Sequence, residues 1–258
     1  EAGAFVDKPS PHWSEVKPLF MGLQHHKCVF CERQLGHGAI EHDLEHFRPK
    51  SSTKAWQPEE LPGFPLRDGL AEGYWWLAYD LGNYAASCKF CNSTLKSNRF
   101  PIRGRVGEPE EGVDVLLGAE QPYLVFPVGD LDVDPEELFA FEGMLMVPGE
   151  TASPWNRARA AVTIAFFDLN REDLTKERAR GIKAVYHAYG NHVQDPSSLH
   201  TEELKQALSR TEAHTACRRA YYHCLRAQPG VAYGYFEAAV EWLRLLIDDA
   251  DADFDLDG

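Results

Sequence analysis

The sequence predicts an α+β protein of two parts, and three observations carry that prediction. Four of the six cysteines form two C-x-x-C pairs in the N-terminal half, among short aromatic and strand-like segments. Strand-like composition returns between residues 122 and 149, and helical patterns dominate from Ser153 onward. We therefore expect a small mixed domain over residues 1–108, a mainly α-helical domain with a small β-hairpin over 109–250, and an acidic tail over 251–258.

The N-terminal elements follow from turn residues and aromatic content. Residues 1–25 are expected to form a loop and a short helix that lead into the first cysteine pair. A tight turn at that pair, a glycine-containing turn and a short strand ending near His46 follow. Residues 51–73 are rich in proline and glycine and predict a surface loop. The aromatic stretch before the second cysteine pair, GYWWLAYDLGNYAASC, is expected to supply the core of the small domain.

The C-terminal elements begin after a plausible linker, EPEEG at 108–112. Two segments have strand-like composition, PYLVFPV and LFAFEGMLMVPG, and the second predicts a hairpin that turns at Glu142-Gly143. Ser153 predicts a helix N-cap, with Pro154 at the first helical position. The remaining helical patterns cover 171–189, 201–226 and 233–248.

Composition is that of a globular protein: 258 residues, of which 44% are hydrophobic and 26% are charged. No apolar run approaches the roughly 20 residues that span a bilayer, and none resembles a signal peptide. Paired C-x-x-C motifs in a chain of this size, without a leader, favour metal binding over disulfides. We therefore expect a cytoplasmic protein that makes no contact with a membrane.

The charge is unevenly distributed. The formal net charge of −14 argues against nucleic-acid binding, because such proteins usually present a basic surface to the phosphates. However, the C-terminal DDADADFDLDG alone supplies six aspartates, whereas SCKFCNSTLKSNRFPIRGR at 87–105 contains five basic residues and no acid. Since contact depends on local charge, a nucleic-acid site near the second cysteine pair remains compatible with the sequence.

The four paired cysteines, Cys28, Cys31, Cys88 and Cys91, can close a tetrahedral zinc site. A complete shell of four thiolates leaves no open position, so this zinc is expected to be structural and to clamp the two ends of the small domain. The alternative is that the pairs are buried cysteines without a metal. Cys217 and Cys224, seven residues apart in a helical pattern, are expected to be buried and inert.

Residues His42 to His46, HDLEH, allow two incompatible interpretations. They fit H-x-x-E-H, a zinc-peptidase signature in which both histidines lie on one helix. That interpretation needs a helix through 42–46 and a distant third ligand, and Pro49 and the flanking cysteine pairs argue against it. We expect instead that Glu45-His46 closes a strand, and that His42 is structural.

Four further features complete the pattern: Glu45-His46 and Asn83 lie between the cysteine pairs, and Asn92 follows the last cysteine. The corresponding words are CVFCE, LEHFRPK, YWWLAYDLGNY and CKFCNSTLKSNRFP. This order resembles the zinc-supported HNH endonucleases, most closely the HNH proteins of Septu-type and retron-associated phage-defence systems. The resemblance is specific over about residues 25–103. It is looser over 121–180, at LFAFEGM and FFDLNREDLTKER.

The resemblance implies the ββα-metal fold, a strand pair followed by a helix around one divalent ion, and hydrolysis of phosphodiester bonds in DNA. It makes His46 the general base, and Asn83 the residue that orients the loop holding that base. Glu45 stands where the family usually has a metal-binding aspartate, and Asn92 where many members have a metal-binding histidine. A carboxylate and an amide oxygen are hard ligands, which suit Mg²⁺ or Mn²⁺. Histidine, with an ordinary pKa of about 6.5, can accept a proton from water.

Four basic residues near these positions are candidate contacts to phosphate, although each could simply be a solvated charge: Arg48, Lys50, Lys96 and Arg99. Two features depart from the family pattern. Asparagine at 92 leaves the catalytic site poor in ligands, with Asn98 as an alternative metal position. Three residues separate Asn92 from Lys96, where about two are expected.

Aromatic residues near the site could stack on bases, although core packing is favoured for all of them: Trp75, Trp76 and Tyr79. The C-terminal half contains no catalytic cluster. Its amphipathic helices and acidic end indicate a docking module, and the resemblance makes the partner an ATPase. The rival interpretation of the whole chain is a non-catalytic zinc-ribbon module that binds nucleic acid or protein.

Overall fold

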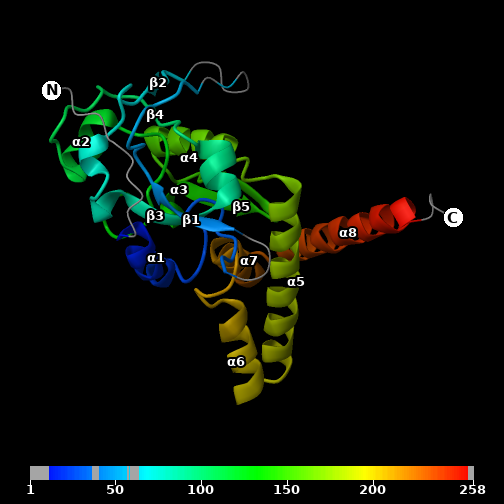
Figure 1. Ribbon diagram of the computed structural model, residues 1–258. Coiled ribbons are helices and arrows are strands. Elements are labelled where there is room, and N and C mark those ends of the chain that lie inside the picture. The colour runs from blue at the N-terminus through cyan, green and yellow to red at the C-terminus, as the bar shows by residue number, and fades with distance from the viewer. Residues whose placement is uncertain (1–11, 37–40, 57, 59–63, 255–258) are drawn as a thin grey trace. The chain divides into compact units, whose positions relative to one another are not determined.

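The computed structural model describes residues 12–36, 41–56, 58 and 64–254 (Figure 1). Within them it combines α-helices with small antiparallel strand pairs, which confirms the predicted α+β class. The chain divides into two compact units. The first unit comprises Glu1–Phe139 and Pro148–Leu169, and the second comprises Ala140–Val147 and Asn170–Gly258.

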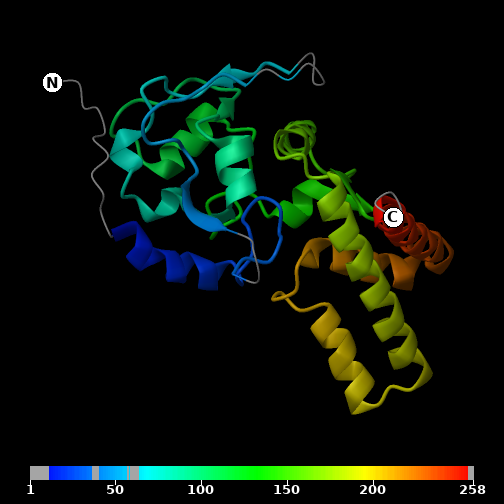
Figure 2. The same ribbon diagram turned by 45° about the vertical axis from the view of Figure 1, so that its right-hand side comes forward.

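The first unit is built on one antiparallel strand pair followed by a helix. Strand β1 (His42–His46) pairs with β3 (Tyr84–Cys88), so that His42 lies opposite Cys88 and His46 lies opposite Tyr84. The helix that follows, η3 (Phe90–Lys96), is a π-helix. Helix α1 (His12–Leu23) packs against both strands (Figure 2). The strand predicted to end near His46 is therefore confirmed.

Around this centre the first unit carries short elements: β2 (Arg67–Asp68) paired with β4 (Pro101–Ile102), η1 (Trp75–Leu77), η2 (Leu81–Asn83), α2 (Val113–Glu120), α3 (Pro135–Leu138) and α4 (Pro154–Phe166). Strand β2 lies inside the stretch predicted to be only loop. The predicted cap of α4 is confirmed, because the Ser153 side chain accepts a hydrogen bond from the backbone of Asn156 at 3.1 Å.

The strand expected from PYLVFPV does not form. Pro122 makes a single bridge with Ile102, and the residues after it are buried without a strand partner. Two side chains of α4 satisfy their carbonyls instead: Arg159 donates to Pro122 and Leu124, and the Thr163 hydroxyl donates to Tyr123. The apolar composition predicted burial correctly, but side-chain donors replaced the sheet.

The second unit contains a hairpin and four helices. Strands β5 (Phe139–Glu142) and β6 (Leu145–Pro148) confirm the predicted hairpin, and Gly143 in its turn has a φ of +60°. The helices are α5 (Glu172–Gln194), α6 (Ser198–Ala207), α7 (Thr215–Ala227) and α8 (Pro229–Phe254). Helix α6 runs back alongside α5 (Figure 2).

Two expectations for this unit were wrong in detail. The single helix predicted over 201–226 is interrupted between α6 and α7, where His214 adopts a left-handed conformation with a φ of +53°. The acidic tail expected from residue 251 is helical as far as Phe254, and residues 255–258 lie outside the described part. Cys217 is buried as predicted, whereas Cys224 is half-buried.

The domain boundary expected after residue 108 falls inside the first unit. Helix α2, which follows the predicted linker, ends at the fully buried Glu120, and this carboxylate is ion-paired with Arg48. Residues beyond 108 therefore complete the core of the N-terminal unit.

Across the described residues, none of the helices combines the length and apolar character needed to cross a membrane.

Candidate functional site

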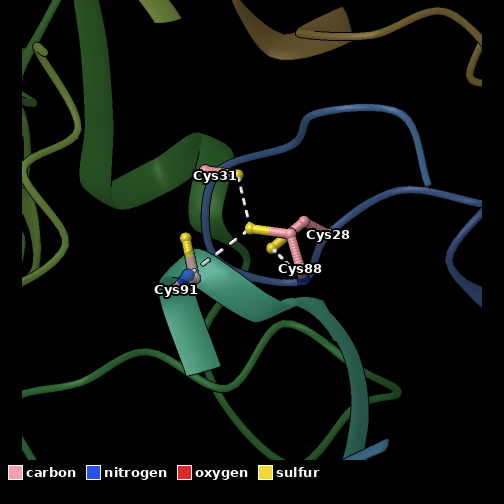
Figure 3. A group of neighbouring side chains, drawn as sticks. All are labelled: Cys28, Cys31, Cys88 and Cys91. Carbon is pink, nitrogen blue, oxygen red and sulfur yellow. Dashed lines mark hydrogen bonds between the residues drawn. The ribbon is translucent and has the colours of Figure 1, made fainter. Parts of the chain in front are cut away.

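The four cysteines of the two C-x-x-C pairs come together in the first unit (Figure 3). Cys28 and Cys31 lie in a tight turn after α1, in which the backbone N–H of Glu32 donates to the carbonyl of Cys28 at 3.0 Å. Cys88 ends strand β3, and Cys91 lies in the first turn of η3. All four side chains are buried, and their sulfur atoms lie within 4.8 Å of one another.

This geometry fits a zinc ion held by four thiolates. A regular tetrahedron with zinc–sulfur distances of about 2.3 Å has sulfur–sulfur edges of about 3.8 Å. The Sγ atoms of Cys31 and Cys88 lie 3.9 Å apart. The backbone N–H of Cys88 also points at the Cys28 sulfur, at 3.3 Å. In the described part of the chain, these cysteines form the one group of three or more His, Cys, Asp or Glu residues suited to a metal.

The cluster needs a cation to stabilise its ionised form. The pKa of Cys31 is raised well above the ordinary value, first by its hydrogen bond with Cys28 and then by that with Cys88. Cys91 is shifted in the same direction: contact with Cys28 raises its pKa, and Cys31 and Cys88 add to the effect. A divalent ion offsets the mutual repulsion of adjacent buried thiolates, so the donor set suits zinc.

Strand β1 excludes the zinc-peptidase interpretation. Because a strand rises about 3.3 Å per residue, His42 and His46 are separated by roughly 13 Å along β1 and cannot share one ion as they would on a helix. The backbone carbonyl of His42 accepts a hydrogen bond from Lys17 at 2.7 Å.

The His46 ring is fixed by two neighbours. Its Nε2 lies 3.0 Å from the carbonyl oxygen of Ala78, and its edge meets the ring of Tyr84 with a centroid separation of 4.9 Å. The Tyr84 hydroxyl donates to the same Ala78 carbonyl. A neutral imidazole that donates from Nε2 carries its lone pair on Nδ1. The ring is half-buried. The arrangement therefore defines which nitrogen could accept a proton.

Asn83 holds the chain just after His46. Its side chain is fully buried: Oδ1 accepts from the backbone N–H of Arg48 at 2.8 Å, and Nδ2 donates to the Arg48 carbonyl at 3.1 Å. The backbone carbonyl of Asn83 accepts from Phe47 at 2.8 Å. One asparagine thus fixes the backbone on the far side of the histidine.

Glu45 points into the protein and is ion-paired with Lys96. The Lys96 ammonium is fully buried, lies 2.6 Å from the Glu45 carboxylate and also donates to the His46 carbonyl at 3.0 Å. Burial raises the pKa of Glu45, and Lys96 acts in the opposite direction. The expectation that Lys96 holds a phosphate was wrong for this conformation, because its charge faces a carboxylate inside the core.

The irregular spacing between Asn92 and Lys96 has a structural explanation. Helix η3 is a π-helix, and the backbone N–H of Ser97 donates to the carbonyl of Asn92, five residues earlier, at 2.5 Å. A π-turn accommodates one residue more than an α-turn. The extra residue is absorbed in the helix, and Lys96 still reaches Glu45. Asn92 is half-buried in the first turn of η3.

The other candidate substrate contacts differ from expectation. Arg48 is only 2% exposed and is ion-paired with Glu120 at 2.8 Å, so its predicted contact with phosphate is not supported. Arg99 is half-buried and donates to the Leu95 carbonyl at 2.7 Å, and Lys50 is half-buried. The alternative metal position, Asn98, donates to the Ser52 hydroxyl at 2.9 Å.

The basic stretch at 87–105 is largely neutralised. Besides Lys96, two of its cations have acidic partners on the surface: Lys89 pairs with Glu41, and Arg105 pairs with Glu111. The local positive charge is thus much smaller than the sequence indicates. Of the aromatic candidates, Trp75 and Trp76 are half-buried, whereas Tyr79 is 59% exposed.

Two buried residues beside the site were missed by the sequence analysis. Glu120 and Tyr74 bond to each other and to the segments around His46. Glu120 ends VDVLLGAE, where an acidic residue at the end of a short helix indicates a solvent-exposed side chain. No local signal in the sequence identifies it.

No protein-family model matches the chain. The chain is similar to the Septu protein PtuB of Bacillus mycoides (strain KBAB4), with 30% identity over 175 residues. The match covers 66% of this chain and 52% of PtuB, so the chain spans about half the length of the curated relative it matches. The similarity supports the expected resemblance to proteins of Septu-type systems.

Proposed function

We propose that the chain is a metal-dependent HNH endonuclease that hydrolyses phosphodiester bonds in DNA, as the effector nuclease of an anti-phage defence system. One arrangement supports this function above the others. A strand pair ends in an oriented histidine, His46, and is followed by a helix that carries Asn92, while four clustered cysteines tie both elements together. The similarity to a Septu protein supports the defence role.

His46 is the proposed general base. Donation from Nε2 to Ala78 leaves the Nδ1 lone pair to take a proton from the attacking water. Asn83 supports this role by holding the backbone at Arg48, directly after the strand. In this proposal the basic imidazole and the chain that carries it are both fixed before substrate arrives, which reduces the cost of reaching the reactive geometry.

Glu45 and Asn92 are the proposed ligands of the catalytic cation. Their oxygen atoms fit Mg²⁺ or Mn²⁺ by donor chemistry, and a carboxylate offers two oxygens, of which Lys96 engages Oε1. When bound, the ion supplies positive charge to the phosphate and to the leaving oxygen. The buried Lys96 keeps Glu45 in the ionised form that such a ligand needs.

The first experiment is a nicking assay on supercoiled plasmid with Mg²⁺ or Mn²⁺, and a panel of DNA and RNA substrates. We expect metal-dependent cleavage of DNA. Chelation by EDTA should abolish cleavage while the structural zinc is retained, because four thiolates hold zinc far more tightly than two oxygen ligands hold Mg²⁺. Absence of cleavage with every metal and substrate, in protein that contains its zinc, would refute the nuclease function.

That outcome would favour a non-catalytic zinc-ribbon module that binds nucleic acid or protein. One observation favours this alternative: Lys96 engages the carboxylate that the catalytic ion would use. The nicking assay separates the two functions directly.

A protein partner is also part of the proposal, and the resemblance makes it an ATPase. The basic stretch is largely neutralised and the chain carries a net charge of −14, so the partner would supply part of the DNA-binding surface. The helical second unit is the proposed docking module. Co-expressed proteins should elute together in size-exclusion chromatography, and separate elution at low salt would contradict the partnership.

A further inference from the structure

A buried carboxylate from helix α2 connects two segments on either side of His46. Glu120 is fully buried and accepts three hydrogen bonds: from the Arg48 guanidinium at 2.8 Å, from the backbone N–H of Gly107 at 3.2 Å and from the Tyr74 hydroxyl. An ionised carboxylate in the core is tolerated only when its oxygens are bonded in this way.

The first connection leads to the chain after His46. Arg48 lies two residues beyond the histidine, and Asn83 holds its backbone N–H and carbonyl. Glu120 holds the other end of the same residue, at its guanidinium. The rings of Phe47 and Phe100 lie 5.8 and 5.3 Å from that guanidinium carbon. Residue 48 is therefore fixed at both its backbone and its side chain.

The second connection leads to the acceptor of the His46 ring. Tyr74 precedes η1, which ends just before Ala78, and the Ala78 carbonyl is the partner of His46 Nε2. The Tyr74 backbone N–H donates to the Pro49 carbonyl at 2.7 Å, and its hydroxyl donates to Glu120. Glu120 thus bonds to both segments whose relative placement sets the hydrogen bond between His46 and Ala78.

We propose that Glu120 is a positioning residue for the candidate active site, acting through Arg48 and Tyr74 to orient the His46 imidazole. The inference rests on the proposed endonuclease function. A purely structural ion pair would contribute to folding alone. Here the two partners lie in the chain that carries the base and in the chain that carries the acceptor of the base, so the carboxylate acts on the geometry between them.

The test compares Glu120→Gln and Tyr74→Phe with wild type, and uses Asp114→Asn as a matched control on the same helix. Glutamine preserves the shape and one acceptor oxygen but loses the charge that faces Arg48. Phenylalanine removes only the hydroxyl and is the safeguard if Glu120→Gln fails to fold. Asp114 is exposed, so its conversion to the amide should change nothing.

Two readouts separate positioning from folding. In plasmid cleavage with Mn²⁺, Glu120→Gln should lower kcat by about a hundredfold and leave KM unchanged, because a small misplacement of a catalytic group affects the chemical step. In nitrogen-15 spectra of labelled histidines, the His46 ring of wild type should show the Nε2–H tautomer, and the variants should show a mixture. The signal is assigned by its loss in His46→Ala.

The outcomes are distinguishable. An unchanged His46 signal in folded, zinc-containing Glu120→Gln and Tyr74→Phe would overturn the inference, and so would a fall in activity that only follows the fraction unfolded. If wild type cleaves no nucleic acid while the His46 signal still changes in the variants, the nuclease function fails and the link from Glu120 to His46 stands.

Discussion

Replacing His46 with alanine is expected to abolish plasmid nicking and to leave the fold and the zinc content intact. General-base catalysis contributes about 10²- to 10⁴-fold to rate, and no other described histidine shares the His46 contact with Ala78. The stability cost should be small, about 1 kcal/mol, because the ring is only half-buried and loses one hydrogen bond and one aromatic contact. Nicking rate, thermal unfolding and the zinc-to-protein ratio measure the three parts of this prediction.

The control is His42→Ala in the same strand. His42 lies at the opposite end of β1, against Cys88, and outside the proposed catalytic groups. This variant should cleave at the wild-type rate. If pure His46→Ala nicks plasmid as fast as His42→Ala, then His46 is not the base.

Replacing Cys88 with alanine is expected to lower bound zinc and the stability of the first unit together. Cys88 ends β3 and its sulfur lies 3.9 Å from that of Cys31, so the variant loses one of four ligands at the junction of strand and helix. Binding of zinc to structural sites of this kind contributes on the order of 10 kcal/mol, which exceeds the stability of many small domains. We expect a zinc-to-protein ratio well below one, less soluble protein and a lower unfolding temperature.

Cys224→Ala is the matched control, since Cys224 is half-buried in the second unit and outside the cluster. It should keep one zinc per chain. A Cys88→Ala protein with an undiminished zinc ratio would remove the proposal that the four thiolates clamp the unit.

Features set by local sequence were predictable. The C-x-x-C pairs, the strand ending at His46, the cap at Ser153 and the turn at Gly143 each depend on a few adjacent residues, and the structure confirms them. The spacing between Asn92 and Lys96 even indicated an irregularity, which the π-helix explains.

The orientation of charged residues was not predictable. Lys96 and Arg48 are indistinguishable in sequence from solvated cations or phosphate ligands. Their partners, Glu45 and Glu120, lie 51 and 72 residues away along the chain. Only the tertiary fold brings such groups together, and a buried pair leaves no periodic pattern. The same limit applies to the carbonyls of residues 122–124, which bond to side chains of α4 instead of a strand.

The π-helix also bears on how related chains are recognised. A wider turn between Asn92 and Lys96 stores a one-residue length difference locally, while the strand pair before it and the lysine after it keep their places. Rigid comparison of such sequences, column by column, would pair this lysine with the wrong neighbour. A search pattern that tolerates either two or three intervening residues would retrieve homologues that a fixed interval overlooks.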